Sequence, residues 1–293
     1  MRVVSLLPSA TEILFAIGAG DQVVGVTFEC DHPPEARERT IVSTSALPPD
    51  LPPEQIDAVV RARLAAGEDL YHLDRGAMAG LEADLVVTQD LCAVCAVDVS
   101  EVNDALGYLG CTAEVLTTDP HTLDEVLDSV RAIGRAVGCE EAASVLVASA
   151  RTRIEEVCRK VAGRPPVPTL LLEWIEPPFA PGHWVPEMVR LAGGEPVLGT
   201  AGAPSTRTSW ERVHAAAPQV VVGAPCGFGL ERAAELTAGT RSLPDGIPVW
   251  AVDANASFAR PGPRLVDGIE VLAAILHPDV CGPPDPLMGR RVR

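Results

Sequence analysis

Short apolar runs recur along the chain and alternate with stretches of helical periodicity. Seven of these runs are rich in Val, Ile and Leu, end at turn-forming residues and are followed by helix-like sequence. They lie at residues 2–7, 22–27, 83–89, 113–118, 168–174, 218–224 and 247–253. Strands that alternate with helices are typical of α/β folds with parallel sheets. Because the runs are divided between the two halves of the chain, the pattern predicts two similar α/β lobes with parallel-type sheets.

A helical region separates the two sets of strands. Apolar residues between positions 123 and 137 step by three and four, which is the stripe of an amphipathic helix. Thr122 and Glu125 have the spacing of a capping box at its start. A second helix is expected over 140–162, and at 1.5 Å per residue it spans roughly 34 Å before the Pro-rich 163–168. We therefore expect one long, rigid helix to join the lobes.

These elements predict the domain organisation. The expected parts are an N-terminal α/β lobe, a connecting backbone helix, a C-terminal α/β lobe and a loose C-terminal tail, at residues 1–139, 140–163, 164–280 and 281–293. In parallel sheets, ligands bind beyond the carboxyl ends of the strands. The loops that follow the strands are therefore expected to line a cleft between the lobes; they are 7–12, 28–33, 89–95, 173–184, 224–229 and 253–264.

Composition narrows the class of protein. The chain has 293 residues, 47% of them hydrophobic, and a formal net charge of −17. This charge argues against nucleic acid or an anionic membrane as the main partner, and no apolar run is long enough to span a membrane. The start of the sequence lacks the pattern of a signal peptide, and its 8 cysteines are not the disulfide framework of a small secreted domain. We expect a cytoplasmic protein, or a periplasmic or cell-surface one if a leader was lost.

Four segments carry a resemblance to a known family. They are RVVSLLPSATEILFAIGAGDQVVGVTFECDHPPEA, ADLVVTQDLCAVCAV, LLLEWIEPPFAPGHWVPEMVRLAGG and DANASFARPGPRLVDGIEVLAAILHP. With the connecting helix, the match covers residues 2–278 in order. The chain resembles the class III, or helical-backbone, substrate-binding proteins of ABC importers, and within them the cobalamin-binding branch. The resemblance implies a binding protein whose cleft changes little on binding, and the sequence contains no nucleophilic triad or P-loop that would indicate an enzyme.

The resemblance also implies contacts with a membrane permease. In the family, a surface glutamate on each lobe docks into arginines of the permease, and the matching positions here are Glu101 in DVSEV and Glu211 in SWERV. The alternative for each glutamate is a structural role in capping a helix. Asp98 and Glu101, and likewise Thr208 and Glu211, have capping-box spacing at expected helix starts.

A corrinoid is a large, flat, partly apolar macrocycle edged with amides, so its pocket needs aromatic faces and hydrogen-bonding groups. The aromatic residues of the strand-end loops are expected to supply the faces; they are Phe28, Trp174, Phe179, Trp184, Phe228 and Phe258. Asn255 and Arg260 are expected to meet the amides. The alternative is that some of these aromatics pack the cores of the lobes.

Histidine offers a ligand for cobalt or another metal. His183, beside a tryptophan at an expected helix start, is the residue expected to ligate, and His32 is a weaker choice. The other four histidines lie away from the expected cleft and receive no role; they are His72, His121, His214 and His277.

The cysteines expected at the cleft allow three interpretations of their role. Cys92 and Cys95 form a C-x-x-C pair after a strand, and Cys30 and Cys226 fall in other strand-end loops. Together the four thiolates suit zinc or an iron–sulfur cluster. The pair alone at a helix start suits redox chemistry, and all four also fit as reduced, pocket-lining residues. Two hypotheses follow. The first is a protein that binds a corrinoid or similar tetrapyrrole, either for an ABC importer with its permease as partner or as an intracellular relative. The second is a cytoplasmic metalloprotein with a Cys-rich cleft site, which includes the case of an enzyme.

Overall fold

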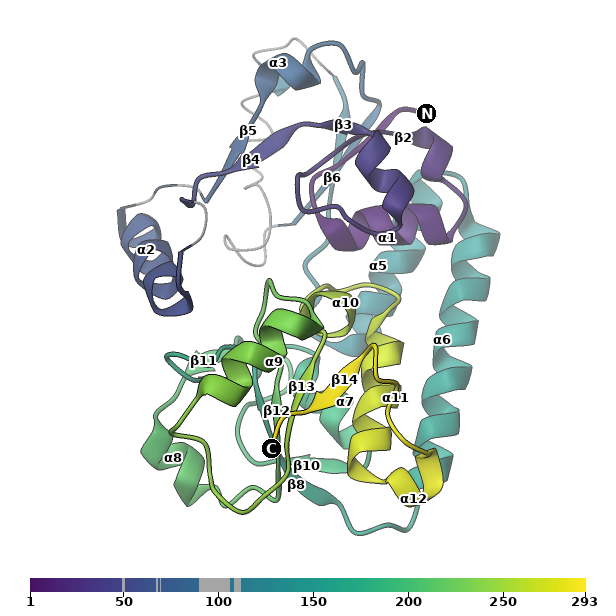
Figure 1. Cartoon of the computed structure of the whole chain (residues 1–293). Helices are drawn as coiled ribbons and strands as arrows, with labels where there is room; N and C mark the ends of the chain where they lie inside the picture. The colour runs from purple at the N-terminus through teal and green to yellow at the C-terminus, as the bar shows by residue number, and fades with distance from the viewer. Residues whose placement is uncertain (49–50, 67, 69, 90–105, 108–111) are drawn as a thin grey trace. The chain divides into compact units, whose positions relative to one another are not determined.

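The computed structural model describes residues 1–48, 51–66, 68, 70–89, 106–107 and 112–293 (Figure 1). The chain divides into two compact units. Unit 1 comprises Met1–Pro120 and Leu127–Val147, and unit 2 comprises His121–Val126 and Ala148–Arg293.

Unit 1 is built on a five-stranded parallel sheet with the strand order β3-β2-β1-β6-β7. Its strands are β1 (Val3–Ser5), β2 (Val23–Val26), β3 (Thr40–Ile41), β6 (Leu85–Thr88) and β7 (Glu114–Thr117). A second, antiparallel pair joins β4 (Ser43–Ser45) to β5 (Tyr71–Leu73). The short helices are α1 (Pro8–Ala16), η1 (Gly20–Gln22), η2 (Pro34–Glu38), α2 (Pro53–Ala66) and α3 (Arg75–Met78).

Unit 2 repeats this plan with the strand order β10-β8-β12-β13-β14, in which only β14 runs antiparallel to its neighbour. Its strands are β8 (Val167–Leu172), β10 (Gly194–Pro196), β12 (Val220–Gly223), β13 (Val249–Val252) and β14 (Gly289–Arg291). A small antiparallel pair joins β9 (Phe179–Ala180) to β11 (Thr206–Arg207). The helices are α7 (Val185–Leu191), α8 (Trp210–Ala215), α9 (Leu230–Gly239), α10 (Ala254–Ser257), α11 (Leu265–Leu276) and α12 (Pro278–Cys281).

The predicted fold class is confirmed. Each of the seven apolar runs contains a strand of one of the two main sheets. Leu170, Leu171 and Leu172 of β8 are each at most 1% exposed. Consecutive residues of a strand point to opposite faces, so both faces of this sheet are covered, as expected for parallel sheets.

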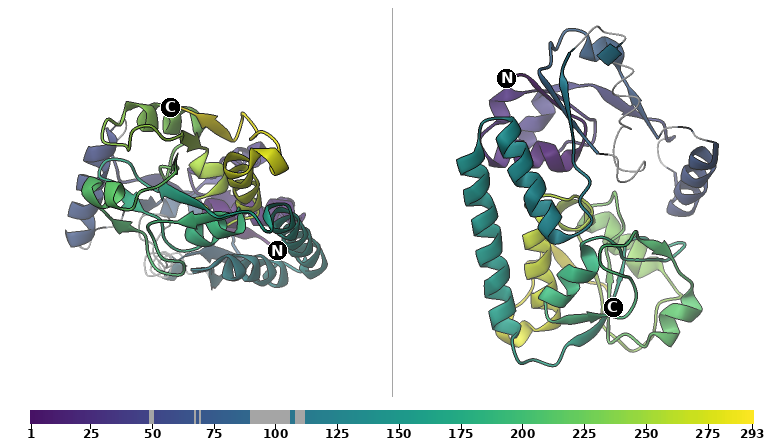
Figure 2. Two further views of the ribbon diagram at one scale, coloured as in Figure 1. Left: turned by 90° about the horizontal axis from the view of Figure 1, so that it is seen from below. Right: turned by 180° about the vertical axis from the view of Figure 1, so that it is seen from behind.

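Two helices run from one unit into the other. They are α5 (Leu123–Ala136) and α6 (Glu140–Val161), and Figure 2 shows α6 as one unbroken helix. The capping box at the start of α5 is present, because Thr122 Oγ1 accepts from the Glu125 amide at 3.3 Å and Glu125 Oε2 accepts from the Thr122 amide at 3.1 Å. The prediction of a long helix over 140–162 is thus correct to within a residue.

The prediction of a loose tail over 281–293 is wrong. Strand β14 pairs with β13, the amide of Val249 donates to the Arg293 carbonyl at 3.0 Å, and Arg290 forms a double ion pair with Glu231 of α9. The tail is therefore the edge strand of the unit 2 sheet (Figure 1).

Candidate ligand-binding site

Two aromatic rings meet where strands of unit 2 end. Trp174 follows β8 and Phe228 follows β12; their ring centroids are 5.7 Å apart with a tilt of 34°. The Phe228 carbonyl accepts a hydrogen bond from the backbone N–H of Asn255, which follows β13, at 3.3 Å. Both rings are half-buried. The carboxyl ends of three neighbouring parallel strands thus bring an aromatic pair and the backbone of Asn255 together. The binding role of these residues stays a prediction.

A third aromatic residue is tied to this pair by the backbone. Phe179 of β9 donates its amide to the Trp174 carbonyl at 3.0 Å, and its own carbonyl accepts from the Glu173 amide at 3.2 Å. The Glu173 carboxylate holds the same loop further on, because Oε1 accepts from the Gly182 amide at 3.0 Å. We define the aromatic edge of unit 2 as the half-buried residues Trp174, Phe179 and Phe228.

Two other predicted aromatic residues pack the core of unit 2 instead. Trp184 is 5% exposed and Phe258 is 2% exposed, and the Trp184 indole N–H donates to the Phe258 carbonyl at 2.8 Å. Rings this deeply buried offer no face to a ligand in this conformation. For these two residues the core-packing alternative therefore holds. Arg260, two residues beyond Phe258, is half-buried in the same loop.

His183 lies beside His121, a histidine for which the sequence predicts no role. The His183 ring is 5.7 Å from that of His121 and 5.6 Å from that of Trp184, centroid to centroid. Burial, and secondarily the neighbouring His121, lowers the pKa of His183. The imidazole is therefore biased toward its neutral form, which has a lone pair available for a metal. No sequence pattern relates these two residues, so only the fold reveals the pair.

In unit 1, the predicted residues Phe28 and Cys30 follow the carboxyl end of β2. Phe28 is half-buried, and its ring centroid lies 5.9 Å from that of Tyr71. Cys30 is 2% exposed, and its Sγ lies 2.9 Å from Thr11 Oγ1 within a buried group of hydroxyls. Cys30 thus fits the alternative of a small, buried residue.

The predicted four-cysteine site finds no support. Cys92 and Cys95 lie outside the described residues, as does Glu101. Cys30 belongs to unit 1, whereas Cys226 is exposed in unit 2. Among the residues that the structure describes, no three His, Cys, Asp or Glu side chains are grouped to hold a metal ion.

Glu211 is exposed in the first turn of α8. The expected cap at Thr208 is wrong by one residue, because Ser209 caps the helix by accepting from the Arg212 amide at 3.3 Å. A hydrogen bond with Ser209 lowers the pKa of Glu211, so the side chain is ionised at neutral pH. Its docking role stays a prediction.

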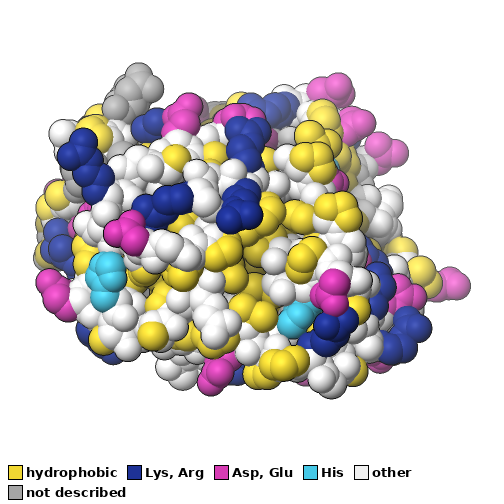
Figure 3. All heavy atoms as spheres, turned by 60° about the horizontal axis from the view of Figure 1, so that its bottom comes forward, with side chains coloured by type: hydrophobic (Ala, Val, Ile, Leu, Met, Phe, Trp, Pro, Cys, Tyr) yellow, Lys and Arg dark blue, Asp and Glu magenta, His cyan; other side chains and the backbone are white. Residues whose placement is uncertain are grey.

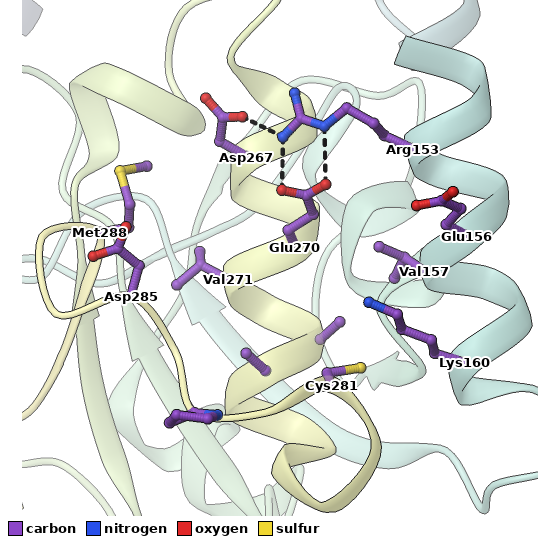
Figure 4. Close-up of a pocket in the computed structure, with 13 residues that line it drawn as sticks. Arg153, Glu156, Val157, Lys160, Asp267, Glu270, Val271, Cys281, Asp285 and Met288 are labelled. Atoms are coloured by element: carbon purple, nitrogen blue, oxygen red, sulfur yellow. Dashed lines mark hydrogen bonds and ion pairs between the residues drawn. The ribbon is translucent and has the colours of Figure 1, made fainter. Parts of the chain in front are cut away.

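A charged cavity of about 490 Å³ lies elsewhere in unit 2. It is lined by α6, α11 and the segment after α12 (Figure 4). Arg153 of α6 donates to Glu270 at 2.9 and 2.6 Å and to Asp267 at 2.6 Å, so this part of the cavity wall is an ion-pair network between two helices.

Charged side chains of both signs lie on one face of the molecule. On the face shown in Figure 3, Lys and Arg side chains are interspersed with Asp and Glu. Within the described part of the chain, every helix is too short or too polar to cross a bilayer.

Comparison with known proteins gives a consistent result. The profile of the family described as periplasmic binding protein matches residues 108–243. The chain is 25% identical over 278 residues to the vitamin B12-binding protein of Vibrio cholerae serotype O1, covering 94% of this chain and 88% of the relative. It is 26% identical over 295 residues to the uncharacterized ABC transporter substrate-binding lipoprotein YvrC of Bacillus subtilis, covering 95% and 80%.

Solved structures show the same fold. A periplasmic heme binding protein from Pseudomonas aeruginosa matches with a TM-score of 0.73 at 18% identity, covering 99% of this chain and 97% of that one. The periplasmic vitamin B12 binding protein BtuF of Vibrio cholerae matches with a TM-score of 0.65 at 24% identity, covering 94% and 96%. At these identities the likeness establishes the two-lobed α/β fold.

Proposed function

We propose that the chain is a class III periplasmic binding protein that binds a corrinoid and delivers it to an ABC permease. The family and its structural neighbours are binding proteins, not enzymes. The observation that carries the ligand proposal is the aromatic edge of unit 2. A corrinoid presents a broad flat face, and half-buried rings at strand ends are suited to stack against it.

The relatives support this choice of ligand. The relative that matches over 94% of this chain is named for vitamin B12. Haem is the second candidate, since the heme-binding proteins among the solved structures share the fold. Both ligands are flat tetrapyrrole-type macrocycles, so the aromatic edge alone does not separate them.

The relatives also bear on location. They are named as a lipoprotein and, among the solved structures, as periplasmic proteins. This favours the periplasmic or cell-surface alternative over the cytoplasmic prediction, and we propose that the protein acts outside the cytoplasm. The proposed permease contacts are Glu101 and Glu211.

Calorimetric titration with cyanocobalamin tests the ligand and the aromatic edge together. We expect saturable binding with one ligand per chain, and we expect Trp174→Leu to weaken it roughly fivefold or more, because stacked aromatics contribute about 1 kcal/mol or more beyond their buried area. Phe15→Leu is the matched control. Phe15 is also half-buried, but it lies at the end of α1, away from the strand ends.

Equal affinities of wild type, Trp174→Leu and Phe15→Leu would show that the aromatic edge is not the site. Absence of heat with excess cyanocobalamin would remove the corrinoid proposal itself. Circular dichroism on each variant establishes that a lost signal reflects the ligand contact and not unfolding.

A further inference from the structure

Two imidazoles lie close together in unit 2. The ring centroids of His121 and His183 are 5.7 Å apart with a tilt of 42°. Imidazoles that share one metal ion at metal–nitrogen distances of about 2.0–2.1 Å have ring centres roughly 5–6 Å apart. Both histidines are half-buried, so the pair is shielded yet open to solvent.

His183 is held in an unusual backbone conformation. Its φ is +48°, in the left-handed region that few residues other than glycine adopt. The backbone is fixed there on both sides, because the His183 amide donates to the Ala203 carbonyl at 2.6 Å and the Gly202 amide donates to the His183 carbonyl at 2.9 Å. Preceding Gly182 is packed so closely against the backbone at Ser205 that a β-carbon does not fit. A strained backbone conformation that the surrounding structure holds in place is a feature of functional positions.

The segment that carries His121 is held by two carboxylates. Its amide donates to Glu125 Oε2 at 2.6 Å, within the capping arrangement of α5. The amide of Leu123 donates to Glu187 Oε2 at 3.1 Å, and Glu187 lies one turn beyond His183, in α7. This second bond ties the segment that carries His121 to the helix that follows His183. The pairing of the two rings is thus built by the backbone on both sides.

We propose that His121 and His183 form a bis-imidazole site for a divalent transition-metal ion in unit 2. Neutral imidazole is a ligand for Ni²⁺, Cu²⁺ and Zn²⁺. Among the described residues, no third His, Cys, Asp or Glu completes a group with this pair. In the proposed site, water or a small chelator that arrives with the ion fills the remaining coordination positions. The site does not depend on the corrinoid proposal.

Nickel is the probe that best separates this site from the thiols of the chain. Thiolates favour Zn²⁺ and Cu⁺, whereas imidazole suits Ni²⁺. Tag-free protein, stripped with a chelator, is titrated with Ni²⁺ at pH 7.5 by calorimetry. We expect one site per chain, and we expect His121→Asn and His183→Asn each to weaken binding by at least about tenfold, the range seen when a metal site loses support.

Asparagine is the substitution of choice because it tolerates the left-handed backbone at position 183 and has no imidazole. The control is His214→Asn, since His214 is an exposed histidine of α8. Unchanged Ni²⁺ affinity in both pair variants, or an equal loss in His214→Asn, overturns the proposal. Loss of Ni²⁺ binding in both pair variants, with Ni²⁺ binding kept in His214→Asn, supports it. Failure of the wild-type protein to bind cyanocobalamin bears only on the proposed function.

Discussion

Arg153 is the residue that fastens the long helix α6 to the body of unit 2. Its guanidinium donates to both oxygens of Glu270 and to Asp267, residues nearly one turn apart on α11 (Figure 4). These hydrogen bonds, led by that to Glu270, raise the pKa of Arg153. Only arginine has the planar fork that meets one carboxylate twice and still reaches a second.

Replacing Arg153 is expected to weaken this attachment. The three side chains are 35–42% exposed, so solvent screens the pairs, and we expect Arg153→Lys to lower the free energy of unfolding by about 1 kcal/mol. Urea denaturation measures this. The control is Arg159→Lys on the same helix, where a 4.0 Å exposed pair with Glu156 predicts a change near zero. Equal effects of the two substitutions would contradict the role given to Arg153.

His183 makes stability depend on pH in a defined direction. Because burial lowers its pKa in the folded protein, the unfolded chain binds a proton more readily at this site. Its contribution to stability is fully present above about pH 6.5 and is lost as the pH falls toward the folded pKa. In metal-free buffer, we expect the loss of stability between pH 7.5 and 5.5 to be smaller in His183→Asn than in wild type. A matching loss in both proteins would refute this.

At the scale of elements, the features formed by residues close together in sequence were the ones that could be predicted. The capping box of α5 could be predicted because two residues spaced three apart, Thr122 and Glu125, form both hydrogen bonds. The strand β14 could not, since its sequence, GRR, has no strand-like run. It is held by backbone bonds to β13 and by the pair between Arg290 and Glu231, which are far apart in sequence.

The capping box has a predictable energetic value. Thr122→Ala removes the side-chain oxygen that accepts from the Glu125 amide, and we expect it to cost about 1 kcal/mol of folding stability. Thr122→Ser keeps that oxygen and should stay close to wild type. The comparison of denaturation midpoints checks this; a Ser variant as unstable as the Ala variant would show that the cap is not the cause.

The C-terminal strand is expected to be part of the cooperative fold. Removing residues 289–293 exposes the edge of β13 to solvent, so we expect a lower melting temperature and a greater tendency to aggregate. Arg290→Ala, which removes only the exposed ion pair with Glu231, should have a small effect. If the truncated protein melts like wild type, the tail contributes nothing to the sheet's stability.

At the scale of the whole molecule, the order of strands and helices was enough to predict the fold class, because periodicity marks each element. The candidate ligand-binding site could be predicted from the sequence only in part. Trp174 and Trp184 look alike in sequence, ten residues apart, yet one is half-buried at the strand ends and the other is in the core. That difference arises from packing between distant segments, and the His121–His183 pair arises in the same way.

Competition between the two macrocycles tests the central claim most directly. Ligand-stripped protein is dialysed against equimolar cyanocobalamin and haemin, and the absorption spectrum of the retained material is recorded. The proposed function predicts one corrinoid per chain and no bound haem. A spectrum that shows bound haem, or no retained macrocycle at all, would contradict it.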